Sequence, residues 1–386
     1  MRFDWLVVGA GLSGATMAER IATQLGQTVL VIDRRPHVAG NAYDELDEAG
    51  IRVHRYGAHI FHTNSERVWE YLSTFTTWVP YTHRVRGQVG RAVVPIPFNL
   101  VSLYNLMPDE AEGFEEKLLA YVGPEKSISV LALLEHHDAS LRQLGTYVYE
   151  HVFCGYTVKQ WGLRPEQIDR AVTGRVPIVV SRQDRYFRDK YQGIPADGYT
   201  AMVERILDHP LIDVETGLEF RDASHRVRYD RLVFTGQIDE FFGFVHGPLP
   251  YRSLRFENEV LPIDRHQPVA VMNYPGEVPY TRVIEHAHFT DQHIGRSTVT
   301  YEFPEPYARN SNEPYYPLPT PHSRVRYQRY AKTALELRGQ AIFSGRLAEY
   351  RYYDMDQAVS HALAKFTREI VGRSSGQSTA YAAPGR

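Results

Sequence analysis

The chain begins with an apolar run, a glycine-rich turn and a segment with helical periodicity. Residues 3–8 are apolar and β-branched, which is typical of a buried strand, and apolar positions then recur at helical spacing up to about Leu25. A second apolar strand is predicted over residues 28–32. Strand, turn, helix and strand in this order predict the start of an α/β domain with a parallel sheet.

Later regions of the chain have other periodicities. Between residues 99 and 170 apolar positions lie three and four apart, which predicts helices over 112–122, 130–135 and 141–153. Aromatic or β-branched residues alternate with Pro and Gly turns over residues 78–98, 171–192 and 238–328. That alternation favours a mostly antiparallel sheet.

The turn after the first strand has the pattern G-x-G-x-x-G, at Gly9, Gly11 and Gly14. The first glycine permits a tight turn, the second lets a pyrophosphate approach the backbone, and the third lets helix and strand pack closely. Helix N–H groups then face the anion. Asp33 follows the second strand, nineteen residues after Gly14, where its carboxylate can accept hydrogen bonds from ribose hydroxyls. These features predict a dinucleotide cofactor.

The residues after this carboxylate favour FAD over NAD. Residues 34–42 are basic and then glycine-containing, as in flavoproteins of the glutathione reductase type, and do not return at once to a helix. A strand predicted over residues 229–236 ends in Thr235-Gly236 and resembles the second short flavin-proximal motif of that class.

A helix is predicted over residues 355–371, with Asp354 or Asp356 as its cap. Its positive N-terminus would lie near the N1/C2 edge of a flavin, where it would stabilise an anionic reduced ring. The alternative is a terminal core helix with no part in cofactor binding.

Because the flavin motifs are far apart, we predict an α/β fold in which a Rossmann-like FAD-binding domain is discontinuous. That domain comprises residues 1–77, 193–237 and 329–372. Two domains are inserted into it: a helical domain over 99–170, and a mostly antiparallel β-sheet substrate domain over 78–98, 171–192 and 238–328. Residues 373–386, rich in Ser, Gly and Ala, are expected to be disordered.

The amino-acid composition excludes several classes of protein function. The formal net charge is −3, from 43 Lys and Arg against 46 Asp and Glu, so no broad surface for nucleic acid is expected, although a few arginines can form a local anion pocket. No stretch approaches the roughly 18 uncharged apolar residues of a membrane span. A strand that starts at residue 3 leaves no space for a signal peptide, and we expect a cytoplasmic protein. A single cysteine, Cys154, excludes an internal disulfide, and the 26 tyrosines suit nucleotide and sugar surfaces.

Five further blocks are spread over the chain: residues 57–63 (GAHIFHT), 155–162 (GYTVKQWG), 184–187 (DRYF), 313–317 (EPYYP), and 345–347 (GRL) with 352–356 (YYDMD). In type and order they resemble those of bacterial UDP-galactopyranose mutases, and the resemblance covers nearly the whole chain. It implies an isomerase of galactofuranose biosynthesis that interconverts UDP-galactopyranose and UDP-galactofuranose without net redox change. The implied cofactor is reduced FAD, whose N5 attacks the anomeric carbon while UDP departs.

The G-x-G-x-x-G pattern with Asp33 and the resemblance to the family together assign the site residues. The cofactor contacts are predicted at Gly9, Gly11, Ser13, Gly14, Asp33, Arg34, Gly40, Asn41, Gly57, His59, Leu218, Thr235, Arg346, Asp354 and Met355. A departing diphosphate needs planar, permanently charged donors, and the resemblance gives this role to Arg175 and Arg282. The other substrate contacts that it implies are Tyr156, Trp161, Tyr186, Asn273, Tyr316, Tyr352 and Asp354.

Residues 159–182 contain Gly162, Pro165, Gly174 and Pro177, which is typical of a mobile segment. In the family a lid in this area closes on the nucleotide, which would keep water from a reactive intermediate. His62, implied to lie beside the flavin, is a candidate general acid or base, with a purely positioning role as the alternative. No metal site is predicted, because no group of histidines has a recognised ligand spacing.

Three functions stay open on the sequence. The first is the mutase, acting on UDP-galactose or on a related nucleotide-sugar. The second is a flavin-dependent oxidoreductase of the amine-oxidase type on the same fold, and the third is a nucleotide-sugar binding protein without turnover. The paired arginines and the tyrosines favour a diphosphate substrate over an apolar amine. For the mutase we expect an electron donor such as NAD(P)H for flavin reduction, a homo-oligomer, and no nucleic-acid partner or membrane insertion.

Overall fold

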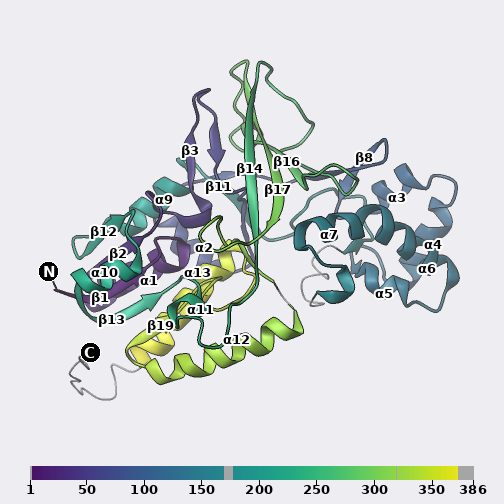
Figure 1. Ribbon diagram of the computed structural model, residues 1–386. Helices are drawn as coiled ribbons and strands as arrows, with labels where there is room; N and C mark the ends of the chain where they lie inside the picture. Colours follow the sequence, from purple (N-terminus) through teal and green to yellow (C-terminus); the bar gives the residue numbers. More distant parts are fainter. Residues whose placement is uncertain (1, 169–176, 319, 373–386) are drawn as a thin grey trace.

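A computed structural model describes residues 2–168, 177–318 and 320–372 of the chain. A parallel five-stranded sheet lies on one side of the molecule, in the order β12-β2-β1-β13-β19 (Figure 1). Its strands are β1 (Arg2–Val8), β2 (Val29–Asp33), β12 (Ile212–Thr216), β13 (Arg228–Phe234) and β19 (Ala341–Phe343). All of them fall in the ranges predicted for the dinucleotide-binding domain.

Helices cover both faces of this sheet, as its continuous apolar strands require. Trp5 and Val7 of β1 point to a core with α1 (Leu12–Leu25), α2 (Glu66–Ser73), α9 (Gly198–Leu207) and α13 (Met355–Lys365). Leu6, between them, points to the opposite core. There it meets α10 (Phe220–Arg226), α11 (Ile238–Phe241) and α12 (Pro321–Ala334).

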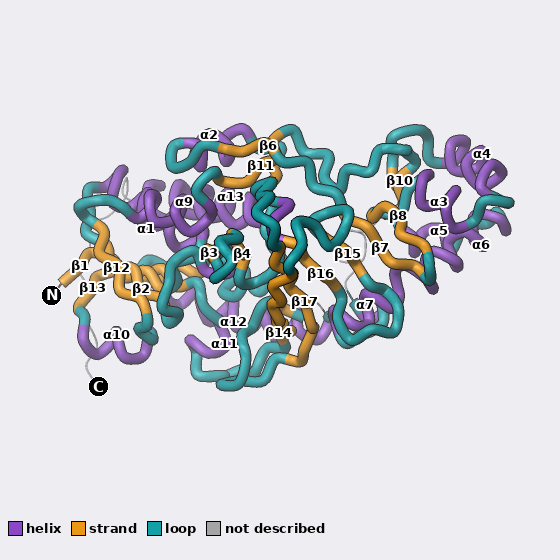
Figure 2. Tube along the Cα trace, turned by 90° about the horizontal axis from the view of Figure 1, so that it is seen from above, coloured by secondary structure: helices purple, strands orange, loops and turns teal. Residues whose placement is uncertain are grey.

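A seven-stranded sheet occupies the middle of the molecule, in the order β18-β14-β17-β16-β15-β7-β8 (Figures 1 and 2). Its strands are β7 (Val85–Val89), β8 (Ala92–Ile96), β14 (Tyr251–Leu261), β15 (Val271–Asn273), β16 (Arg282–Glu285), β17 (Ser297–Pro306) and β18 (Tyr316–Pro317). All neighbouring pairs are antiparallel except β7 with β15.

The helices of the insertion lie on the side of this sheet that is away from the five-stranded sheet (Figures 1 and 2). They are α3 (Leu100–Leu106), α4 (Ala111–Tyr121), α5 (Val130–Leu134), α6 (Ala139–Val148), a π-helical turn (Tyr149–Cys154) and α7 (Gly155–Trp161). Asn99, Ser129 and Asp138 cap α3, α5 and α6 by accepting hydrogen bonds from backbone N–H groups. Small sheets connect the parts: β3 (Asp44–Leu46) with β4 (Arg52–His54), β9 (Ser127–Ile128) with β10 (Ile178–Val179), and β5 (Phe61–Thr63) with β11 (Tyr191–Pro195) and β6 (Trp78–Pro80).

The predicted fold class is confirmed: an α/β fold with a Rossmann-like sheet, a group of helices and a mostly antiparallel sheet. Two local predictions from the sequence differ from the structure. In the described part of 171–192, only β10 and the start of β11 are strands; Arg182 instead binds Glu115 of α4 at 2.6 Å, so polar side chains hold this segment. Helix α12 begins inside the range predicted for the β-sheet domain, yet Tyr330 packs it against the five-stranded sheet. Residues 373–386 lie outside the described residues.

Candidate active site

A cavity of about 820 Å³ lies where β1, β2 and β13 end. Its lining includes Gly9 and Thr235, which follow β1 and β13, and Asp33, which ends β2. The carboxyl ends of parallel strands are the expected place for a dinucleotide. The predicted cofactor residues that line it are Gly9, Gly11, Ser13, Gly14, Asp33, Arg34, Gly40, Asn41, His59, Leu218, Thr235, Arg346, Asp354 and Met355. Gly57 lines the neighbouring cavity.

The backbone around this cavity fits a diphosphate. The N-cap of helix α1 is Gly11, which has no side chain to cap the helix, and the first turn has no acidic residue. The first N–H groups of the helix are therefore left for an anion. Gly9 has φ 103°, and a Cβ on Gly14 would lie 1.9 Å from the Gly9 carbonyl oxygen. A Cβ on Gly40 would lie 3.0 Å from the Gly11 Cα. Side chains at Gly14 and Gly40 would therefore clash with the backbone of the turn that forms the cavity wall.

Asp33 is buried, and its carboxylate already organises the turn. Oδ2 accepts a hydrogen bond from the backbone N–H of Ala10 at 2.8 Å, and Oδ1 accepts one from Arg35 at 2.9 Å. A carboxylate can accept about four hydrogen bonds, so capacity for a ribose hydroxyl is left. Arg34 and Arg35 both pair with Glu313, which closes the adjoining wall.

A second cavity, of about 530 Å³, adjoins the first. The two share Asn41, His59, Tyr315, Arg346, Asp354 and Met355 in their linings. The second is lined by His62 and by the predicted substrate residues Tyr156, Trp161, Tyr186, Asn273, Arg282, Tyr316, Tyr352 and Asp354. The remaining candidate, Arg175, lies outside the described residues, as do residues 169–176 of the predicted mobile segment. The described start of that segment consists of the end of α7, Gly162 in the left-handed conformation and a 3₁₀ turn, Pro165–Gln167.

Aromatic rings from three distant segments meet at the junction of the cavities. The ring centroids of Trp161 and Tyr316 are 5.9 Å apart, and those of Tyr316 and Tyr352 are 5.3 Å apart. The Arg346 guanidinium lies 5.4 Å and 5.3 Å from the centroids of Tyr316 and Tyr352. A cation over two rings forms a flat, positively charged wall.

Five buried polar atoms of residues that line this second cavity lack a hydrogen-bond partner among the described residues: His83 Nδ1, the Tyr156 hydroxyl, Gln160 Oε1, Asn273 Oδ1 and Arg282 Nε. Arg282 Nη1 lies 3.7 Å from the carboxylate of Glu302, which is 1% exposed. Burial alone disfavours a charged guanidinium, but the acidic groups around Arg282 keep its pKa well above the ordinary value. Buried unpaired donors and acceptors are costly unless a ligand satisfies them. The arrangement therefore suits a polar, anionic ligand.

His62 is held on two sides. Its Nδ1 lies 2.9 Å from Oδ2 of Asp189, and its ring stacks on Phe187 with centroids 3.6 Å apart. Asn64 Nδ2 donates to the other oxygen of Asp189 at 2.6 Å. A carboxylate at Nδ1 favours a proton there, which leaves Nε2 as the second, free ring nitrogen. Burial lowers the pKa of nearby His59 to about 3, so that imidazole stays neutral.

The N-terminus of α13 points to the place where the cavities meet. Asp354 is its N-cap, as one of the two predicted alternatives has it, and Gln357 Oε1 accepts from the Asp354 N–H at 3.2 Å. Asp356 instead accepts a hydrogen bond from Thr63 at 3.0 Å. Because Asp354 and Met355 line both cavities, the positive end of the helix dipole lies at their junction.

Sequence reasoning missed two residues of this site, Glu302 and Asp189. Glu302 alternates with Thr298 and Thr300 along β17, a polar pattern that normally marks a solvent face. Asp189 follows the DRYF block closely, and that proximity is the one signal that could have indicated it.

The described part of the chain has neither a membrane-spanning helix nor a metal-binding cluster. No helix there is long and apolar enough to cross a membrane. Within the same residues, no group of three or more His, Cys, Asp or Glu side chains is arranged to hold a metal ion.

Known proteins resemble the chain along most of its length. A profile of the family described as UDP-galactopyranose mutase matches residues 151–352, and one for NAD(P)-binding Rossmann-like domains matches residues 7–75. The probable UDP-galactopyranose mutase of Klebsiella pneumoniae is 37% identical over 368 residues, which covers 93% of this chain and 92% of that protein. The dTDP-fucopyranose mutase of Escherichia coli is 37% identical over 370 residues, covering 93% and 96%.

A crystal structure of reduced UDP-galactopyranose mutase superposes with a TM-score of 0.69 at 16% identity, over 97% of this chain and 99% of that one. At this identity the likeness shows a common fold, whereas the sequence matches show descent. The chain belongs to the UDP-galactopyranose mutase family of isomerases, as its separated blocks predict.

Proposed function

We propose that this protein is a FAD-dependent mutase that interconverts UDP-galactopyranose and UDP-galactofuranose without net redox change. The single observation that carries the proposal is the junction of the two cavities. A dinucleotide cavity at the strand ends shares its lining with a cavity that has a partly buried arginine and unpaired polar atoms. A cofactor ring and a nucleotide-sugar would meet there.

FAD fits the first cavity on the chain's own features. The α1 N-terminus would hold the diphosphate and Asp33 a ribose, while Asn41, His59 and Met355 would surround the ring at the junction. When bound and reduced, the flavin supplies a nucleophilic N5 for the anomeric carbon. The α13 N-terminus would stabilise negative charge on the reduced ring.

Arg282 would bind the diphosphate, both before and after it separates from the sugar. Its planar donors match phosphate oxygens, and its unpaired Nε is available for them. Glu302 keeps the guanidinium in place and offsets part of its charge, which would favour release of the nucleotide after the reaction. From the resemblance, Arg175 is the second diphosphate ligand.

The aromatic rings at the junction of the cavities would enclose the sugar. Trp161, Tyr316 and Tyr352 present flat surfaces with few competing donors, which suits sugar rings and excludes water from the reacting carbon. His62 would exchange a proton with a sugar hydroxyl through Nε2, while Asp189 holds Nδ1.

A second candidate has a specific observation behind it. The E. coli dTDP-fucopyranose mutase is as similar to this chain as the K. pneumoniae relative. A mutase for a dTDP-linked deoxyhexose would use the same cofactor and arginines. The amine-oxidase type of activity is disfavoured, because an apolar amine would leave Arg282, Asn273 and Tyr156 unpaired.

Product analysis tests the proposal. The purified protein should be yellow, and after reduction with dithionite it should convert UDP-galactofuranose to UDP-galactopyranose without stoichiometric consumption of NAD(P)H. The unreduced enzyme is the control, and UDP-galactose and dTDP-fucose are compared under the same conditions. Turnover of the dTDP-sugar alone would favour the second candidate. A colourless protein would overturn the flavin assignment.

A further inference from the structure

Lys159 lies on α7, and its ammonium is surrounded by backbone carbonyls of one loop. This loop, residues 274–281, connects β15 to β16. Lys159 Nζ contacts the carbonyl oxygen of Tyr274, and lies 2.9 Å from that of Gly276 and 3.0 Å from those of Val278 and Tyr280. An ammonium has three N–H donors, so the four acceptors saturate it.

A second contact brings α7 and this loop together. Gly155 lies one helical turn before Lys159, and a Cβ there would be 2.3 Å from the carbonyl oxygen of Pro275. Residues four apart share a helix face, so Gly155 and Lys159 together form the surface on which the loop packs. The loop is closed at its base by a hydrogen bond from the Tyr274 N–H to the Thr281 carbonyl at 2.9 Å.

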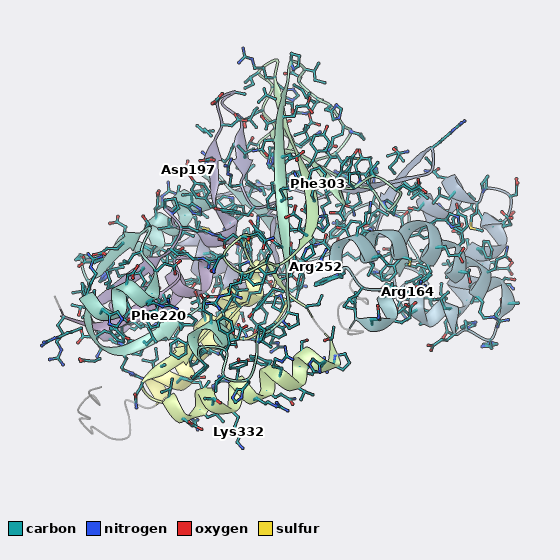
Figure 3. The ribbon with its side chains drawn as sticks, in the orientation of Figure 1. Arg164, Asp197, Phe220, Arg252, Phe303 and Lys332 are labelled. Atoms are coloured by element: carbon teal, nitrogen blue, oxygen red, sulfur yellow. The ribbon has the colours of Figure 1, made fainter. Side chains whose placement is uncertain are left out.

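The other end of α7 is also fixed. Arg252 of β14, labelled at the centre of Figure 3, donates to the carbonyls of Gln160 at 3.0 Å and Lys159 at 3.1 Å. These are among the last carbonyls of the helix, which have no partner within it. Helix α7 is therefore bound both to the loop and to the start of β14.

These contacts join the two halves of the substrate cavity. Asn273 and Arg282 directly flank the loop, at the end of β15 and the start of β16, whereas Tyr156 and Trp161 are on α7. The Arg282 guanidinium lies 5.8 Å from the Tyr156 ring centroid. The loop has no regular secondary structure, so its carbonyls need an external partner to fix its path.

We propose that Lys159 is a positioning residue for nucleotide binding: its ammonium holds the 274–281 loop against α7 and so sets the distance between Arg282 and Tyr156. This inference rests on the proposed function, because it concerns the same diphosphate site. Lys159 itself does not line the cavity.

The test is UDP binding by the oxidised holoenzyme, measured by isothermal titration calorimetry. Lys159→Ala should weaken UDP binding by at least about tenfold, as expected for the loss of one charge-assisted hydrogen bond at a site that depends on geometry. Flavin content should stay unchanged. In turnover assays KM should rise more than kcat falls. Lys117→Ala is the matched control, because its ammonium binds Asp138 and Ser140 inside the helical insertion, and none of these three residues lines the cavity.

Chemical rescue separates positioning from general stabilisation. Propylammonium replaces the atoms removed in Lys159→Ala and should restore UDP affinity several-fold. Tetramethylammonium at the same concentration carries the charge without N–H donors and should have no effect. If Lys159→Ala does not fold, Lys159→Met, which keeps most of the stem, is measured for UDP affinity in its place.

The outcomes are distinct. UDP affinity equal to wild type in either folded variant, or rescue by tetramethylammonium as large as by propylammonium, overturns the role of Lys159 and leaves the proposed function standing. Failure of the wild-type protein to bind UDP overturns the proposed function itself.

Discussion

The cavity at the strand ends and the cavity beside it differ in what forms their working surfaces. In the first, the key groups belong to the backbone: glycines at close approaches, the N–H groups of α1, and Asp33 bonded to two backbone N–H groups. In the second they are side chains from α7, β15, β16 and the segment before α13, with unpaired polar atoms among them.

This difference predicts different tolerances. A backbone-built site depends on fold geometry, so one methyl group in the wrong place removes the site together with the fold. A side-chain site can lose a functional group while the fold persists, and its unpaired atoms indicate that stability has been given up for binding. Substitutions in the two cavities should therefore separate cofactor retention from turnover.

The largest effect is expected from Gly14→Ala. The new Cβ would lie 1.9 Å from the Gly9 carbonyl oxygen, and neither backbone segment can move without separating α1 from β1. Flavin content, measured by absorbance after purification, should fall to less than about a tenth of wild type, since core clashes of this kind cost several kcal/mol. Gly113→Ala is the control: it is in α4, its Cβ meets nothing within 4 Å, and it should be neutral or slightly stabilising. Full flavin content in Gly14→Ala would contradict the backbone-built character of this cavity.

Next in size is Arg282→Lys, which keeps the charge beside Glu302 but loses the planar pair of donors. We expect kcat/KM to fall about 10²- to 10³-fold, as for removal of a donor that stabilises developing charge, with flavin content unchanged. Arg255→Lys is a suitable comparison, because Arg255 forms exposed pairs with Glu257 and Glu305 and should keep wild-type turnover. Loss of flavin from Arg282→Lys would mean that the two cavities are not separable.

The same contrast explains what could be predicted from the sequence. Gly9, Gly11, Gly14 and Asp33 were predicted from spacing alone, because a backbone-built turn needs fixed residue types at fixed intervals. Side chains of the second cavity come from segments more than a hundred residues apart, so no local pattern relates Tyr156 to Arg282; only the resemblance to a family did.

Two residues, one beside the second cavity and one in its lining, show why local sequence patterns fail there. Lys159 was not predicted as a functional residue, because its partners are carbonyls that any sequence provides, 115 to 121 positions later. Glu302 resembles a surface residue until the fold covers it. In both cases the partner is set by tertiary packing and not by the neighbouring sequence.

The smallest expected effect is a pH dependence of UDP binding. Burial lowers the pKa of Lys159 to about 8, so the ammonium loses a proton as the pH rises through that value. The titratable groups on the elements packed against α7 are Tyr274, Glu277 and Tyr280 of the loop, Arg252 at the start of β14, and Tyr301, Glu302 and Glu305 of β17. Burial raises the pKa of Tyr274, which places its ionisation above its ordinary range.

The direction of this pH dependence follows from the number of N–H donors on Lys159. Below pH 8 three N–H groups and a positive charge hold the carbonyls; above it a neutral amine has two N–H groups and no charge, so the loop loosens and UDP affinity falls a few-fold. The diphosphate is already ionised throughout this range and adds no change of its own. Calorimetric titrations from pH 7.5 to 8.5, below the range in which the uracil N3–H of UDP ionises, should show the decrease in wild type and a flat profile in Lys159→Met. A wild-type profile that is equally flat would mean that the second cavity, like the first, keeps its geometry without help from a titrating side chain.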